Sequence, residues 1–158
     1  MDSKTLRLQK SAANLQRRWR ERYLADLRPD LSAYLTSRPF LTVPETDELA
    51  DRFGAAYDAP PAGQRHVELY APAAVLGLVA ALPDSDAPAW LMPTGYHETG
   101  GGAFAVPLSW GRLHAAALWS DTERDDFNLV AADGSAGVLV TVWIADELEY
   151  NVRAWPVS

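Results

Sequence analysis

The side chains best suited to acid–base chemistry or metal binding are three histidines, His66, His97 and His114. His66 stands two residues before Glu68, so a strand here would place both side chains on one face. Imidazole and carboxylate groups are suitable ligands for zinc or iron. None of the histidines, however, has the helical His-Glu-x-x-His spacing or another diagnostic separation. We therefore predict no metal ion and no cofactor.

Glycines at residues 100–102 are the second feature with a chemical use, because glycine-rich loops bind phosphates. Such a loop needs Gly-x-Gly-x-x-Gly or Gly-x4-Gly-Lys-Ser/Thr, and neither pattern is present. Ser109 lacks the Gly-x-Ser-x-Gly pattern of a nucleophile elbow, and the absence of cysteine excludes thiolate catalysis. We favour a protein that is not an enzyme. The alternative is a small enzyme or ligand-binding domain with a site around residues 95–102, His66 and His114.

Charge is distributed unevenly along the chain, whose net charge is −7. Residues 1–28 contain eight Lys or Arg and three acids, whereas the remaining residues contain six Arg and 18 acids. Exposed aromatic side chains are enriched at protein interfaces, and an acidic surface accelerates association with a basic protein. We predict a partner-binding patch in the last third of the chain, made of Asp121, Glu123, Asp125, Asp126, Trp143, Asp146, Glu147, Glu149 and Tyr150.

The composition resembles that of immunity proteins, small acidic bacterial proteins that block a cognate basic toxin such as a nuclease. This resemblance implies a non-enzymatic binding module whose partner is a basic protein. The N-terminal Lys and Arg residues are followed by no apolar run, so no secretory signal is expected. The longest apolar run, residues 71–82, is too short to span a bilayer. We therefore expect a cytoplasmic protein without a membrane partner.

Residues 3–28 show the period of an amphipathic helix, which Pro29 ends. One stripe is apolar and is expected to pack on the core: Leu8, Ala12, Leu15, Trp19, Tyr23 and Leu27. Seven Lys or Arg take the other side. The aromatic residues lie on the apolar stripe and not among the arginines, which argues against a nucleic-acid platform. A phosphate-bearing surface, an acidic partner and a docking role in a larger assembly remain as alternative uses of the basic side.

The rest of the chain predicts further helices and then mainly strands. Helices are expected at residues 31–37, at residues 71–82, and from the capping box Thr42-x-x-Glu45 to about Tyr57. Strands are expected at residues 66–70, 89–92, 104–106 and 109–120, and in three runs after Asp126, of which residues 138–144 are apolar on both faces. We predict a single α+β domain over residues 1–158. Its helical half, residues 1–58, packs on a mainly antiparallel sheet of five to six strands in residues 64–158.

Overall fold

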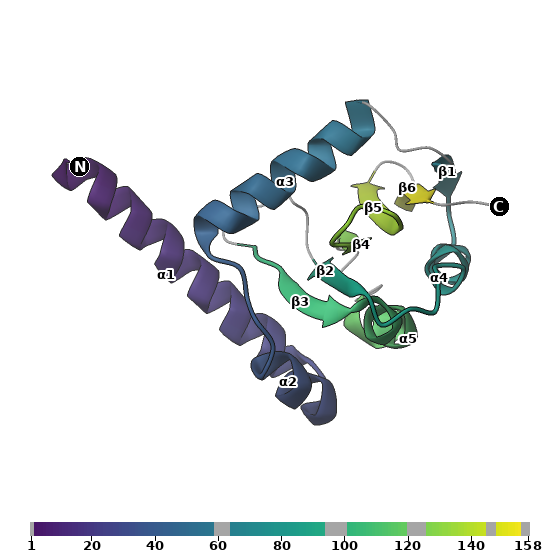
Figure 1. Cartoon of the computed structure of the whole chain (residues 1–158), viewed down its shortest axis with the longest axis horizontal. Coiled ribbons are helices and arrows are strands. Elements are labelled where there is room, and N and C mark those ends of the chain that lie inside the picture. The colour runs from purple at the N-terminus through teal and green to yellow at the C-terminus, as the bar shows by residue number, and fades with distance from the viewer. Residues whose placement is uncertain (1, 59–63, 94–100, 120–125, 145–147, 156–158) are drawn as a thin grey trace.

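The structure is a computed structural model that describes residues 2–58, 64–93, 101–119, 126–144 and 148–155. Its fold is α+β, as predicted, with helices packed on one antiparallel sheet of six strands (Figure 1). The helices are α1 (Ser3–Asp26), α2 (Pro29–Thr36), α3 (Val43–Asp58), α4 (Pro72–Ala80) and α5 (Leu108–Leu118). The strands are β1 (Arg65–Leu69), β2 (Pro88–Met92), β3 (Phe104–Pro107), β4 (Phe127–Ala131), β5 (Gly137–Ile144) and β6 (Leu148–Trp155).

The strand order in the sheet is β1-β6-β5-β4-β2-β3. β5 lies inside the sheet and pairs along its whole length with β6, from Gly137 opposite Trp155 to Ile144 opposite Leu148. Its residues Val138, Leu139 and Val140 are fully buried, which confirms the prediction of a central strand covered on both faces for the first half of β5. In the second half, Trp143 is 59% exposed, so one face is not covered there. The edge strand β3 is covered in part by the segment before α3. The backbone there exchanges two hydrogen bonds with it: the Ala105 N–H donates to the Pro39 carbonyl at 2.9 Å, and the Leu41 N–H donates to the Ala103 carbonyl at 3.0 Å.

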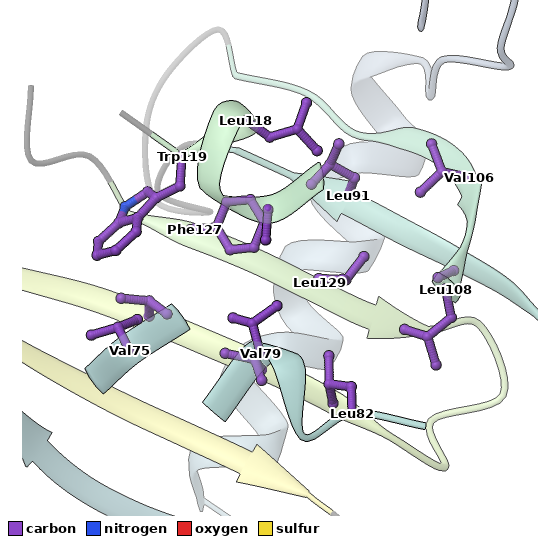
Figure 2. Close-up of a cluster of buried hydrophobic side chains, with 14 of the residues drawn as sticks. Val75, Val79, Leu82, Leu91, Val106, Leu108, Leu118, Trp119, Phe127 and Leu129 are labelled. Carbon is purple, nitrogen blue, oxygen red and sulfur yellow. The ribbon is translucent and has the colours of Figure 1, made fainter. Parts of the chain in front are cut away.

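Each face of the sheet has its own hydrophobic core. On one face, α4 and α5 bury side chains such as Val79 and Leu118 against Phe127 and Leu129 of β4 (Figure 2). On the other face, α3 packs Leu49 and Phe53 against Met92, Val130, Leu139 and Trp155. The alternation of β4 and β5 residues between these two cores follows from the two-residue period of a strand.

The sequence prediction of a strand over residues 109–120 is wrong, because this segment forms α5. The buried positions of α5 are Leu108, Gly111, Ala115 and Leu118, whose spacing of three, four and three residues is that of one helix face. Two of these positions hold small residues. A Cβ atom on Gly111 would meet the methyl groups of Leu129, so the missing side chain lets α5 approach β4 closely.

Among the described residues, only the C-terminal part of α1 packs on the other elements. Trp19 and Tyr23 stack at a centroid distance of 5.3 Å and join the core, and the Tyr23 hydroxyl donates to the Leu118 carbonyl at 3.1 Å. Leu8 and Leu15, which we expected in the core, are 62% and 46% exposed. The predicted stripe is therefore buried over half its length only. Within the described residues, neither α1 nor any other helix has the length and apolar character needed to cross a membrane.

Candidate functional site

The face of the sheet that carries α3 is open over β5, β6 and β1. Val67, Val142 and Val152 point to the α4–α5 side, where they pack in or against the core. Their neighbours along each strand must therefore point to the α3 side. We call this set of neighbours the open sheet face: His66, Glu68, Thr141, Trp143, Glu149, Asn151 and Arg153. All are exposed or half-buried, in contrast to the buried residues below α3.

Strand register fixes the neighbours on the open sheet face. Trp143 is 59% exposed and stands directly opposite Glu149, while Asn151 stands between Thr141 and Glu68. The Asn151 side chain contacts Glu149 at 3.5 Å and the His66 ring at 3.3 Å. A large indole thus lies on a hydrogen-bonded polar surface that includes two carboxylates.

Trp143, Glu149 and Asp126 of the predicted patch lie on or beside this face. An Asp126 carboxylate oxygen accepts the backbone N–H of Val142 at 2.8 Å, which places the start of β4 against the second half of β5. Tyr150 is only 1% exposed, and its ring packs edge-on against Trp119 in the core. Our placement of Tyr150 in a surface patch is therefore wrong, because its neighbour Glu149 takes the outward position of β6. The other five patch residues lie outside the described residues: Asp121, Glu123, Asp125, Asp146 and Glu147.

The histidines do not support the alternative site. His66 is on the open sheet face, whereas His114 is on α5, which covers the opposite face and where its ring lies 4.9 Å from that of Trp110. The sheet therefore separates the two side chains, and His97 lies outside the described residues. Among the residues that the structure describes, no three His, Asp or Glu side chains are grouped as metal ligands.

An apolar groove between α3 and the turn from β4 to β5 was not predicted from the sequence. It has a volume of about 390 Å³, and its walls include Phe53, Trp90 and Trp155. The Trp155 indole N–H donates to the Gly134 carbonyl at 2.8 Å and so fastens this turn to β6. Hydrogen bonds from Ser135 hold the pKa of Asp133 below its ordinary value, so the turn keeps a carboxylate at the rim. In the sequence, the Asp133-Gly134 dipeptide is typical of a tight turn but does not indicate a groove.

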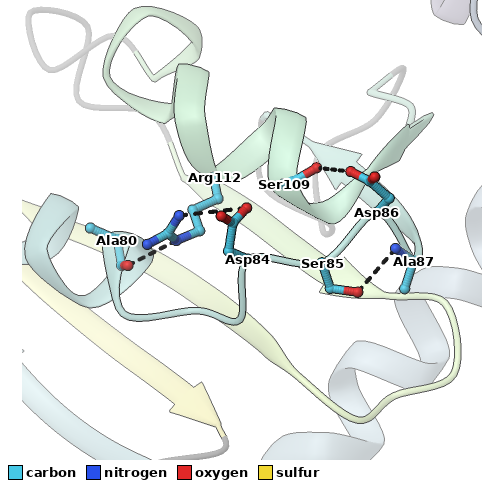
Figure 3. A network of polar contacts seen from close by, with 7 residues as sticks. All are labelled: Ala80, Asp84, Ser85, Asp86, Ala87, Ser109 and Arg112. Carbon is cyan, nitrogen blue, oxygen red and sulfur yellow. Dashed lines mark hydrogen bonds and ion pairs between the residues drawn. The ribbon is translucent and has the colours of Figure 1, made fainter.

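Ser109 belongs to a polar network that joins the loop before β2 to α5 (Figure 3). Its hydroxyl donates to the Asp86 carboxylate at 2.6 Å. Arg112 lies 3.9 Å from Asp84 and donates to the carbonyl of Ala80 at 2.9 Å, near the last turn of α4. These contacts provide a hydrogen bond for a carbonyl at the end of α4 and hold the loop before β2 against α5. The network therefore explains Ser109 by a structural role and does not assign catalysis to it.

Comparison with curated proteins and with solved structures finds no match for this chain. Comparison with protein families does find one, described as YokC prophage protein, over residues 1–144. The matched part contains every described element except β6. Since it covers most of the sequence, the chain belongs to the YokC prophage protein family.

Proposed function

We propose that this protein is a non-enzymatic binding module of the immunity type, which neutralises a basic bacterial toxin in the cytoplasm. A prophage is a phage genome carried in a bacterial chromosome, so the family places the chain in a bacterial setting. The observation that carries the proposal is the position of Trp143. Its indole is 59% exposed on the part of the α3-bearing sheet face where α3 does not pack, directly opposite Glu149.

Burial of this tryptophan in a complex would supply substantial binding energy. A tryptophan side chain presents up to about 250 Å². A partner that covered the 59% now exposed would gain about 3–4 kcal/mol at roughly 25 cal/mol per Å². Tryptophan is also among the residue types most enriched in interface hot spots. An exposed indole beside polar and acidic side chains, near the end of β5, therefore suits a protein partner.

Charge indicates the chemistry of that partner. Glu68 and Glu149 lie on the open sheet face, and Asp126 lies beside it, whereas Arg153 is its one guanidinium. In the sequence, Asp146 and Glu147 join β5 to β6, the two strands that carry Trp143 and Glu149. A basic protein would be attracted to such a surface, and salt would weaken the attraction.

The test is affinity isolation from a lysate of the bacterium that carries the prophage, with the full chain as bait and with stepwise salt elution. We expect a basic protein whose retention falls as the salt concentration rises. Trp143→Ala should reduce its affinity at least about tenfold. The matched control is Leu113→Ala, because Leu113 is 75% exposed but lies on α5, on the other side of the sheet.

Purified partner then allows toxin activity to be measured with and without the chain. Full inhibition by wild type and by Leu113→Ala, with weak inhibition by Trp143→Ala, would support the proposal. Equal binding by wild type and Trp143→Ala, or retention that does not change with salt, would refute it.

A further inference from the structure

The N-terminal half of α1 projects away from the other described elements of the domain (Figure 1). We call residues 3–15 the arm. All its side chains are exposed except that of Ala12, which is half-buried, and Leu6, Leu8 and Leu15 are 44%, 62% and 46% exposed. Gln16 is the first buried side chain, and its amide donates to the Thr46 hydroxyl at 3.1 Å. A helix of this length is marginal in water by itself, so apolar cover would stabilise it.

The arm is basic and α3 is acidic. The arm carries Lys4, Arg7 and Lys10 and no acidic residue. The exposed side of α3 carries four acids, Glu45, Asp47, Glu48 and Asp51, beside the single cation Arg52. Among the described residues, the ion pairs join Arg28 to Asp30 and Arg112 to Asp84. Neither the cations of the arm nor the acids of α3 are therefore neutralised by ion pairs within the described part of one copy.

Both surfaces also expose apolar residues. The apolar groove of about 390 Å³ runs beside α3, and Phe53, Ala55 and Trp155 lie in its walls. The charged residues in these walls are Arg52 of α3 and Asp133 of the turn, whereas the four acids of α3 lie on its exposed side outside the groove. The arm has the complementary pattern, since leucines alternate with cations along it.

We propose that the arm of one copy docks on α3 and the apolar groove of a second copy, so that two chains exchange arms in a symmetric dimer. The arm cannot dock on its own α3, because α1 is one continuous helix that diverges from α3 towards its N-terminus (Figure 1). Pairing of two arms with each other would oppose like charges. In a dimer with two-fold symmetry, each arm docks on the other copy through the same contact, as in most homodimers.

This dimer goes beyond the proposed function, because it uses α3 and the groove and leaves Trp143 exposed. A phosphate-rich membrane or nucleic acid is disfavoured as the binding partner of the arm. The reason is that the acids of α3 lie close to the base of the arm, where Gln16 contacts Thr46. Such a surface would attract the arm but repel the body of the protein.

The first experiment measures the mass of the full chain in solution by sedimentation equilibrium over a range of concentrations. We expect a dimer for wild type and a monomer for the variant Lys4→Glu/Arg7→Glu/Lys10→Glu. Its matched control is Arg17→Glu/Arg18→Glu/Arg22→Glu, which makes the same charge change on the packed half of α1 and should remain a dimer. The uncharged variant Leu8→Ala/Leu15→Ala should raise the dissociation constant at least about tenfold, because it removes apolar burial at two sites.

The second experiment tests the contact directly by exchanging charges. The variant Asp47→Lys/Glu48→Lys/Asp51→Lys should also be a monomer alone, because its α3 repels the basic arm. Mixed in equal amounts with the arm variant, it should form a heterodimer, since both arm contacts then join opposite charges. Formation of the heterodimer also shows that both variants are folded.

Three results would overturn the inference. They are a monomeric wild type at all concentrations, a dimer that the arm variant leaves unchanged, and a mixture of the two charge variants that stays monomeric. Arm-dependent binding of a monomeric wild type to phosphatidylserine vesicles or to duplex DNA would assign the arm to one of those surfaces instead.

Discussion

Replacing Gly111 by alanine should destabilise the protein, whereas the same replacement at Gly77 should stabilise it. Both glycines lie inside helices, Gly111 in α5 and Gly77 in α4. They differ in what a new Cβ atom would meet. At Gly77 nothing lies within 4 Å, but at Gly111 the new atom would lie 2.7 and 2.9 Å from the two methyl groups of Leu129.

The magnitudes decide the sign of each effect. Alanine in a helix interior is favoured over glycine by about 1 kcal/mol, so Gly77→Ala should raise the free energy of unfolding by about 0.5–1 kcal/mol. At Gly111 the same gain is opposed by overpacking, which costs about 1–3 kcal/mol. Leu129 is 0% exposed and cannot swing into solvent. We therefore expect Gly111→Ala to lower the free energy of unfolding by up to about 2 kcal/mol.

Urea unfolding followed by tryptophan fluorescence measures both variants, and an unchanged slope with urea would show that only stability has changed. The variant Leu129→Ala provides the decisive background. Without the leucine methyl groups, Gly111→Ala should become about as favourable as Gly77→Ala, although Leu129→Ala itself is less stable than wild type. A stabilising Gly111→Ala in the wild-type protein would refute the close packing of α5 on β4. So would an equal loss with and without Leu129.

Three other predictions concern a cap, a hydrogen bond and the open sheet face. Thr42→Ala should lower the free energy of unfolding by about 1 kcal/mol in urea titrations, because it removes the hydroxyl that accepts the Glu45 N–H at 3.3 Å. The backbone N–H and hydroxyl of Thr42 lower the pKa of Glu45 from its ordinary 4.5. The stability contributed by ionised Glu45 is therefore present above pH 4.5 and is lost as pH falls through the lowered pKa. Glu45→Gln should remove this contribution to the pH dependence of the free energy of unfolding, measured from about pH 6 to 3. Tyr23→Phe should lower the thermal midpoint by an amount equivalent to about 1 kcal/mol, since it removes the bond to the Leu118 carbonyl; an unchanged midpoint would show that this bond contributes nothing. Trp143→Ala should change the free energy of unfolding by less than about 0.5 kcal/mol, because the indole is exposed; a larger loss would mean that it supports the fold rather than a partner.

Local signals in the sequence were sufficient where the partners are near each other in the chain. The capping box is the clearest case: the Thr42 N–H donates to Glu45 at 3.0 Å, as the Thr-x-x-Glu spacing predicts. The first half of β5 was also predicted correctly, because apolar residues on both of its faces require cover on both sides. In both cases the chemistry that stabilises the element is contained in a few consecutive residues.

The sequence was misleading where small residues occupy buried positions. In α5 the buried face is formed partly by Gly111 and Ala115. Such small residues add little hydrophobicity to the periodic pattern by which a helix is predicted. Their burial depends on Leu129, a residue of β4 that is distant in sequence. The open sheet face was only half predicted for a different reason. Tyr150 shares its face of β6 with Leu148, Val152 and Ala154, so the alternation itself places it towards the core, and grouping it with its neighbour Glu149 in one surface patch was inconsistent with that pattern.

The arm of α1 shows what a hydrophobic stripe can and cannot establish. Its period indicates that one side of the helix needs apolar cover, but the period is the same whether the cover comes from the same chain or from another. Trp19 is covered by its own domain, whereas Leu8, on the same stripe, is not. Two exposed apolar side chains, Leu8 of the arm and Trp143 of the open sheet face, differ in the charges beside them. Cations flank Leu8, whereas the carboxylate of Glu149 faces Trp143. A basic partner is therefore repelled by the arm and attracted to the open sheet face. Dimer formation through the arms would bury the cations and so strengthen, rather than compete with, binding of that partner at Trp143.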